Sequence, residues 1–231
     1  MKKNSFLHKN PVAYLVLPLV FAMLTLLLLA GAVKVFATPY LSLVSWFFTS
    51  SQTQTQPQDL FDEAAAALAD SAETDAQQTI PLSSITYPGD GDRYGRLTIS
   101  GTTVDAPLYY GDGNAILNQG VGTYKDDDRV GIPGEGRTVL LAGHNNTFFN
   151  DLQSVAAGDV VTVETHYGTY TYTVERCEIY DYQDATSYDF TRTDENLILY
   201  TCYPFDALGF TPNRYFVYAS YTSGPALDAA Q

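Results

Sequence analysis

The chain has 231 residues, with 26 acidic and 12 basic side chains, a formal net charge of −14 and only two cysteines. This length excludes a short peptide and a large multidomain assembly, and the excess of negative charge disfavours nucleic acid as a partner. With two cysteines the fold cannot depend on a framework of disulfides, so its core has to come from packing.

Residues 11–33 contain no charged side chain. This run matches the length of about 20 residues that a helix needs to cross a bilayer core of roughly 30 Å. Three lysines precede it, which favours a cytoplasmic tail at residues 1–10 and export of the chain that follows. We therefore predict a single-pass transmembrane signal anchor at residues 11–37. The alternative is a cleavable signal peptide, whose apolar part is usually only about 7–15 residues long.

Residues 38–79 are predicted to link this anchor to a folded domain. Tyr40 and Trp46 are residue types that favour the membrane–water boundary, which indicates an interfacial segment. The polar run TSSQTQTQPQ that follows has no apolar periodicity and is typical of a solvated spacer. An Ala-rich stretch that starts at Asp59 favours a short helix. As a flexible coil, residues 49–79 span about 30 Å, so we expect the folded domain close to the membrane.

From about Ile80 the sequence changes to short β-rich runs separated by Gly and Asp clusters. Alternation is strict over residues 169–174, which predicts a strand with one packed face and one wet face, and HYGTY at 166–170 predicts a hairpin turn. The helical signals at 114–120 and 148–155 support only about two turns each. Seven or eight strands with so little helix predict an all-β domain, either an antiparallel barrel or a sandwich. The β-rich runs are RLTIS, APLYY, RTVLLAG, DVVTVET, GTYTYTVERCEI, NLILYT and RYFVYASY.

Three residues with reactive or charged side chains lie at ends of these predicted strands. His144 follows an apolar strand and the small pair Ala142–Gly143, which would let another group approach closely. Cys202 follows the run NLILYT, and Arg214 opens the last strand. The ends of strands, and the loops after them, are where a rigid scaffold tends to carry reactive groups.

The residues alone leave three interpretations of Cys202 open. It can be a small buried hydrophobe, a disulfide partner of Cys177, or a nucleophile. As a nucleophile it would form an acyl-transfer site in which His144 moves protons to and from an amine and Arg214 stabilises the oxyanion. The other histidine of the domain, His166, lies beside the predicted hairpin turn among polar residues and is interpreted as a solvated surface residue.

The motifs around these residues resemble those of the sortases, which are membrane-anchored cysteine transpeptidases of Gram-positive bacteria with an eight-stranded β-barrel. ILYTC at 198–202 is similar to the family pattern T-L-x-T-C and differs at Ile198, which we expect to face the other side of the strand from Leu199 and to lie in the core. Arg214 follows near the start of the last strand, as in the family. LLAGHNNTFFNDL resembles the context of the family's histidine, and APLYYGDGNAILNQGVGTY resembles the segment upstream of it.

The resemblance implies a role for each candidate residue. Cys202 would be the nucleophile, His144 the general acid and base, and Arg214 the group that positions substrate or stabilises the oxyanion. Thr201 is a candidate substrate contact. The resemblance also implies an all-β, eight-stranded barrel with short helices at residues 80–223, followed by a C-terminal tail at residues 224–231.

The implied reaction is cleavage of an LPxTG-like sorting signal between Thr and Gly through a thioester. The acyl group would then pass to an amine of a cell-wall precursor or of a pilin, outside the cell and next to the membrane that holds the anchor. The organisation resembles class D, with a housekeeping class as the alternative. A membrane-anchored cysteine hydrolase and a non-catalytic binding module with a Cys177–Cys202 disulfide remain as other interpretations.

No cofactor is expected for this chemistry. Calcium activates some relatives, and the obvious local carboxylate cluster is Asp126, Asp127 and Asp128. A solvated acidic loop is the preferred interpretation of this cluster, because calcium needs six to eight oxygen ligands from several segments.

Overall fold

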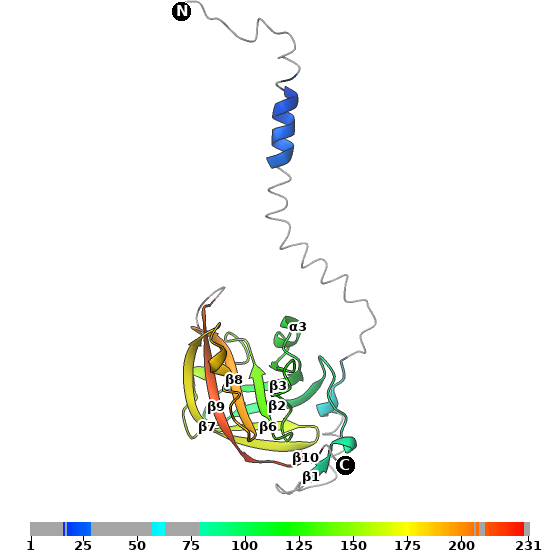
Figure 1. The fold of residues 1–231 in the computed structure, drawn as a ribbon, viewed down its shortest axis with the longest axis vertical. Helices are drawn as coiled ribbons and strands as arrows, with labels where there is room; N and C mark the ends of the chain where they lie inside the picture. The colour runs from blue at the N-terminus through cyan, green and yellow to red at the C-terminus, as the bar shows by residue number, and fades with distance from the viewer. Residues whose placement is uncertain are drawn as a thin grey trace, which may run out of the picture. The chain divides into compact units, whose positions relative to one another are not determined.

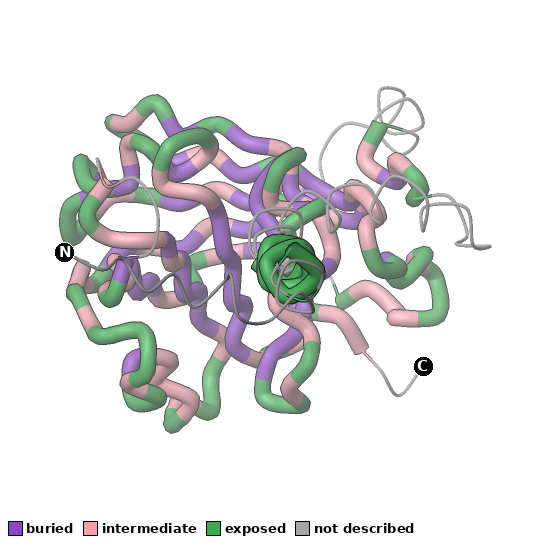
Figure 2. The backbone as a smooth tube through the Cα atoms, turned by 90° about the horizontal axis from the view of Figure 1, so that it is seen from above, coloured by how far each residue is buried: buried purple, intermediate pink, exposed green. Residues whose placement is uncertain are grey.

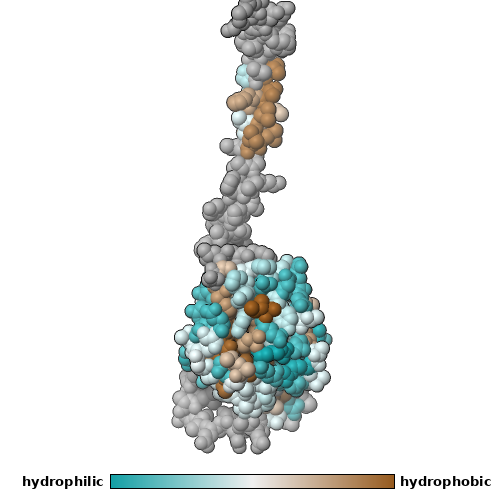
Figure 3. All heavy atoms as spheres, turned by 90° about the vertical axis from the view of Figure 1, so that its left-hand side faces the viewer, coloured by the Kyte–Doolittle hydropathy of each residue, from teal (hydrophilic) through white to brown (hydrophobic). Residues whose placement is uncertain are grey.

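The computed structural model describes residues 16, 18–28, 57–62, 79–205, 207 and 211–228. The chain divides into two compact units, residues 1–55 and residues 56–231. In the first unit the described residues are helical, and their large apolar side chains are exposed, brown in Figure 3. Among the described residues, no helix combines the length and the apolar character that crossing a bilayer requires. Most of the predicted anchor at 11–37 lies outside the described residues, as does the tail at 1–10, so both stay predictions.

The second unit contains ten short or medium strands among its described residues (Figure 1). In chain order the elements are β1 (Thr79–Pro81), η2 (Leu82–Ser84), β2 (Arg93–Ile99), β3 (Asp105–Tyr110), α3 (Asn114–Leu117), β4 (Val121–Thr123), β5 (Thr138–Ala142), η3 (Leu152–Ser154), β6 (Val160–Thr165), β7 (Gly168–Asp181), η4 (Ala185–Tyr188), β8 (Asn196–Tyr203), β9 (Asn213–Ser223) and β10 (Ala226–Asp228).

Eight of these strands close into a barrel in the order β2-β3-β4-β5-β8-β9-β7-β6. The all-β, eight-stranded fold is therefore confirmed. The hairpin turn is confirmed as well, because residues 166–167 join β6 to β7. Of the two helical signals, 114–120 contains α3, whereas 148–155 forms turns and the 3₁₀ helix η3.

The prediction of a purely antiparallel sheet was wrong. The barrel is mixed, because β3 pairs parallel with β4 and β5 pairs parallel with β8. Parallel neighbours need a crossover rather than a tight turn. Residues 111–120, with α3, make the first crossover, and the chain from 143 to 195, with β6 and β7, makes the second. Alternation within single strands does not report these pairings.

Side-chain alternation separates two apolar clusters on the two faces of the barrel wall. The first fills the interior and draws on every strand of the barrel, with fully buried residues such as Leu97, Leu141 and Leu199. The buried residues, purple in Figure 2, fall mostly in the strands, and the exposed residues, green, fall mostly in the connections. In β7 the expected alternation is confirmed, since Tyr170, Tyr172 and Val174 are buried while the residues between them are not.

The second cluster lies on the outer face of β5, β8 and β9, and we call it the outer aromatic cluster. Ile198 is a member while its neighbour Leu199 belongs to the interior, so the expectation that the two face opposite sides is confirmed. Edge-to-face and stacked ring pairs link its aromatic members at centroid distances of 5.6–6.0 Å, the geometry that such rings prefer. Its buried members are Val130, Leu140, Ile198, Phe216 and Tyr218, and Tyr124, Tyr180, Tyr188, Phe190 and Tyr200 pack against it.

Residues 57–62, which the sequence placed in the spacer, pack against the barrel. Leu60 is 6% exposed and belongs to the interior cluster. Arg93 pairs with Asp59 at 2.9 Å and with Asp62 at 3.1 Å. The carboxylate of Asp59 also accepts the Asp62 N–H at 3.0 Å, and residues 60–62 are helical, so the predicted helix start is confirmed.

Strands β1 and β10 form a separate parallel pair, in which Ile80 lies opposite Leu227. The Leu227 N–H donates to the carbonyl of Gly134, which ties β10 to the loop before β5. Glu195 anchors the same loop, because its carboxylate accepts the N–H groups of Gly134 and Gly136 at 3.0–3.1 Å and the Tyr172 hydroxyl at 2.7 Å. Burial raises the pKa of Glu195 above that of an ordinary carboxyl group.

Candidate active site

The register of three adjacent strands brings the predicted site residues to one level of the barrel. In the antiparallel pair β8–β9, Cys202 lies directly opposite Arg214. In the parallel pair β5–β8, the last residue of β5 lies opposite Tyr200. Pairing continues past the end of β5, because the Gly143 N–H donates to the Tyr200 carbonyl at 3.3 Å. Continued by one more residue, this register brings His144 level with Cys202.

The three side chains also share one face of the sheet. Side chains alternate between the two faces of a strand. The outer aromatic cluster includes Tyr200, two residues before Cys202, and Phe216, two residues after Arg214. It also includes Leu140, four residues before His144. All three therefore face outward at the same end of β5, β8 and β9, and all three are half-buried. Because neighbouring strands lie about 4.8 Å apart, Cys202 stands between its two partners and within side-chain reach of both.

Close packing against Gly143 fixes the position of His144. A Cβ atom on Gly143 would lie 2.7 Å from the ring of Phe149, which is fully buried, so only glycine fits here. The Phe149 N–H in turn donates to the His144 carbonyl at 3.1 Å. The close approach that the pair Ala142–Gly143 predicted is thus confirmed, and Phe149 is the group that approaches.

Thr201 lies on the other face of β8 from Cys202. It is 2% exposed, and its hydroxyl donates to the Gly143 carbonyl at 2.6 Å. This bond ties the end of β8 to the end of β5, immediately beside His144. The structure gives Thr201 this positioning contact, and a contact between Thr201 and substrate stays a prediction.

Arg214 is held at the start of β9 by its own turn. Its Nη1 donates to the carbonyls of Thr211 and Asn213, each at 2.9 Å. Burial raises the pKa values of Tyr188 and Tyr200, and the positive charge of Arg214 partly offsets that rise. The guanidinium therefore acts electrostatically on two aromatic residues that pack against the outer aromatic cluster, Tyr188 and Tyr200.

Cys177 does not pair with Cys202, and both cysteines are free. Cys177 of β7 lies opposite Val217 of β9, whereas Cys202 of β8 lies opposite Arg214 of β9. The two cysteines are thus on different neighbours of β9 and on opposite faces, since Cys177 packs against the interior cluster. A disulfide needs Cα atoms within about 7 Å and converging side chains. The disulfide of the binding-module interpretation was therefore wrong.

A pocket of about 220 Å³ with several aromatic rings in its lining opens beside His144, Cys202 and Arg214. We call it the aromatic pocket. It lies on the outer aromatic cluster, and its wall includes Tyr200, two positions before Cys202 on the same face. Arg129 stacks over the ring of Phe190 at 4.3 Å. The sequence did not predict these residues individually, because four separate segments contribute them. The lining is Tyr124, Asp127, Arg129, Leu140, Tyr188, Phe190 and Tyr200.

The interpretation of His166 as a solvated surface residue was wrong. Its ring is half-buried and lies edge-on to Tyr167 at 4.9 Å. Nε2 is 2.9 Å from the carbonyl of Thr86, and Nδ1 is 3.3 Å from that of Tyr94. His166 therefore braces the hairpin turn against the segment before β2, a structural role that polar neighbours in the sequence do not reveal.

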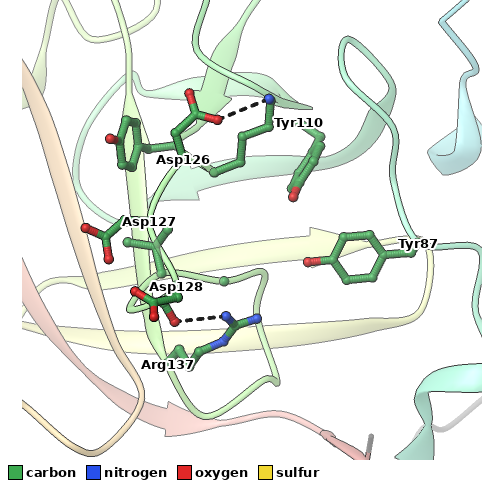
Figure 4. A pocket seen from close by; sticks show the side chains of 10 residues that line it. Tyr87, Tyr110, Asp126, Asp127, Asp128 and Arg137 are labelled. Atoms are coloured by element: carbon green, nitrogen blue, oxygen red, sulfur yellow. Dashed lines mark hydrogen bonds and ion pairs between the residues drawn. The ribbon is translucent and has the colours of Figure 1, made fainter.

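The acidic loop lines a second pocket of about 290 Å³ (Figure 4). Tyr124 and Asp127 line both this pocket and the aromatic pocket. Lys125 pairs with Asp126 at 3.4 Å, and Arg129 pairs with Asp127. Within the residues that the structure describes, no three His, Cys, Asp or Glu side chains are grouped so that they could hold a metal ion.

Comparison with known proteins adds a family match over most of the barrel. A family model described as Sortase domain matches residues 97–222. Sortase D of Bacillus subtilis (strain 168) is 34% identical over 131 residues, which are 57% of this chain and 65% of that protein. The match therefore spans slightly less than two thirds of the curated relative.

Solved structures share the fold. The catalytic domain of B. anthracis SrtD is 31% identical with a TM-score of 0.51, and the likeness covers 63% of this chain and 97% of that one. The SrtA sortase from Actinomyces oris is 22% identical with a TM-score of 0.52, covering 61% of this chain and 85% of that one. The second likeness concerns the fold alone.

Proposed function

This chain belongs to the sortase family, and we propose that it is a cysteine transpeptidase with Cys202 as the nucleophile. His144 serves as the general acid and base, and Arg214 stabilises the oxyanion. One observation carries the proposal: Cys202 stands between the other two residues on neighbouring strands, with all three on one face.

In the first half of the reaction, the Cys202 thiolate attacks the Thr carbonyl of an LPxTG-like sorting signal. A tetrahedral oxyanion forms, and the charge of Arg214, which is permanent at physiological pH, stabilises it. The Thr–Gly C–N bond then breaks. His144 donates a proton to the departing Gly amine, because an amine leaves poorly as an anion. The product is a thioester between Thr and the Cys202 sulfur.

In the second half, an amine of a cell-wall precursor or of a pilin attacks the thioester carbonyl. His144, now neutral, accepts the proton that the attacking nitrogen loses, and the Cys202 thiolate leaves as the new amide bond forms. The net result is the exchange of one amine for another on the same acyl group. No oxidant, reductant or water is consumed.

The aromatic pocket supports an apolar acyl substrate. Leu and Pro precede the reacting Thr in an LPxTG-like signal, and they need an apolar wall next to the nucleophile. Tyr200 and Leu140 provide such a wall. Tyr200 lies two residues before Cys202, and Leu140 lies four residues before His144. A pocket with a few polar groups around an apolar base is the usual form of such a site.

We assign the protein to class D, on the strength of its similarity to Sortase D of Bacillus subtilis and to the catalytic domain of B. anthracis SrtD. We also propose that residues 11–37 anchor it in the cell membrane with the barrel outside. The uncharged run at 11–33 and the exposed apolar helix at 18–28 support this proposal.

The test is a peptide library built on LPxTG, incubated with the barrel unit in the presence and absence of an amine. The proposal predicts cleavage after Thr, and a shift from hydrolysed product to amide product as amine is added. Hydrolysis that no amine diverts would contradict a transpeptidase and favour a cysteine hydrolase.

Three variants assign the roles and one serves as a control. Cys202→Ala should abolish turnover, while His144→Ala should lower kcat by about 10²–10⁴-fold and Arg214→Ala by about 10²–10³-fold. Cys177→Ala should keep turnover, because Cys177 faces the interior. Turnover in Cys202→Ala that matches the parent would reject the assignment.

A further inference from the structure

Arg214 differs from the other arginines of the chain in the way its charge is held. Among the residues that the structure describes, no carboxylate forms an ion pair with Arg214, although the chain carries 26 acidic side chains. Each of the other six arginines has such a pair. These six are Arg93, Arg96, Arg129, Arg137, Arg176 and Arg192.

The described contacts of the Arg214 guanidinium are with neutral groups. Nη1 donates to the carbonyls of Thr211 and Asn213, each at 2.9 Å, and to the Thr211 hydroxyl at 3.3 Å. On another side, Cζ lies 5.7 Å from the centroid of the Tyr182 ring, within the distance of about 6 Å that defines a cation–π contact. The positive charge is therefore held in place without being neutralised by these contacts.

Tyr182 lies on the opposite side of Arg214 from Cys202. The strand order is β8-β9-β7 (Figure 1), and both Cys202 of β8 and Tyr180 of β7 lie opposite Arg214 of β9. The Tyr182 N–H donates to the Pro212 carbonyl at 2.8 Å, which continues the pairing of β7 and β9 past the end of β7. Tyr180 packs against the outer aromatic cluster. Tyr182, two residues further on, therefore belongs to the same face as Arg214.

A ring and a carboxylate would have different effects at this position. A carboxylate would bind the guanidinium more strongly, but it would place a negative charge beside the group that has to stabilise an oxyanion. A ring attracts the guanidinium through its quadrupole and adds no net charge. Because the turn at Thr211 and Asn213 fixes only Nη1, the ring contact restrains the guanidinium from a second side.

From this we propose that Tyr182 is a positioning residue of the transpeptidase reaction. Its ring holds the Arg214 guanidinium from the side of β7 and leaves the charge available to the oxyanion on the side of Cys202. Tyr182 acts through Arg214 rather than on the reacting atoms. This inference rests on the proposed function and adds to it the residue that orients its oxyanion group.

The experiment measures kcat and KM of the full-length protein with an LPxTG-type peptide and an amine. Tyr182→Leu removes the ring and should lower kcat about two- to fivefold, which corresponds to a cation–π contact at a partly exposed site. KM should stay at the parent's value, because the oxyanion exists only in the transition state and the intermediate. Tyr182→Phe keeps the ring and should keep kcat within about twofold of the parent. Tyr182→Glu, which adds the negative charge, should lower kcat further than Tyr182→Leu.

A double-mutant cycle separates positioning of Arg214 from a general effect on the fold. In the Arg214→Ala background, Tyr182→Leu should leave kcat unchanged, because the group that it positions is absent. Tyr221→Leu is the matched control. Tyr221 is 38% exposed and Tyr182 is 43% exposed, but Tyr221 lies seven residues beyond Arg214 along β9. Its substitution should leave kcat at the parent's value.

Three results would overturn the inference and leave the proposed function standing. The first is an equal loss of kcat from Tyr182→Leu with and without Arg214. The second is a loss in Tyr182→Phe as large as that in Tyr182→Leu. The third is a rise in KM at constant kcat, which would assign Tyr182 to substrate binding. Parental kcat in Arg214→Ala would instead reject the role of Arg214 in the proposed function, and this inference with it.

Discussion

The substitution Gly143→Ala tests how the fold positions His144. The added Cβ would lie 2.7 Å from Cδ2 of Phe149, 2.9 Å from Cγ and 3.0 Å from Cε2. Real contacts at such distances require the ring to move, and Phe149 is fully buried in the interior cluster. Overpacking of this kind costs about 1–3 kcal/mol. For a unit of this size, each kcal/mol lowers Tm by about 2–4 °C, so we expect a drop of about 5 °C.

The same clash should reach the chemistry, because the Phe149 N–H is bonded to the His144 carbonyl. A shift approaching 1 Å at a catalytic group can lower kcat by about 100-fold. Thermal unfolding and steady-state kinetics measure the two effects. The double variant Gly143→Ala/Phe149→Leu gives the new methyl group room and should recover part of both. A Tm within about 1 °C of the parent together with unchanged kcat/KM would refute this account of the packing.

Three further predictions concern residues away from this contact. Thr201→Val removes the hydroxyl that donates to Gly143, so the unfolding free energy should fall by about 1–3 kcal/mol in urea titrations; no change would show that the bond is unimportant. Burial raises the pKa of Glu195, so the stability that its protonated form contributes is present below the ordinary carboxyl pKa and is lost as the pH rises through the raised value. In unfolding titrations from pH 4 to 7, the unfolding free energy of Glu195→Gln should therefore rise relative to that of the parent. A difference between the two proteins that stays constant with pH would exclude this linkage. A thiol-alkylating reagent followed by peptide mass mapping should label Cys202 well before Cys177, whose thiol is half-buried, bonded to a carbonyl and raised in pKa by burial; equal labelling would argue against the difference.

The sequence was informative wherever a local pattern decides the structure. Alternation located β7 and the hairpin turn before it, and the apolar runs located β5, β8 and β9. The pair Ala142–Gly143 predicted a close contact because a missing side chain leaves space that a folded core fills. The motifs along the chain predicted that Cys202, His144 and Arg214 are the reactive residues of the site.

Pairings between distant segments could not be predicted in the same way. β4 has only three residues, too few for a periodic signal, and β1 and β10 are strands only because they pair with each other. The parallel pairing of β5 with β8 decides that His144 comes level with Cys202, yet no residue in either strand encodes its neighbour. The lining of the aromatic pocket comes from four separate segments, so only the fold assembles it.

The central claim is that the sulfur of Cys202 carries the acyl group, and the intact mass of the protein tests it most directly. The protein is mixed with the best peptide of the library, quenched in acid within the first turnover and mapped by mass spectrometry. We predict an increase equal to the peptide up to its Thr, located on Cys202 and absent from Cys202→Ala. An adduct on Cys177, or turnover with no adduct in the parent and equal activity in Cys202→Ala, would contradict the account.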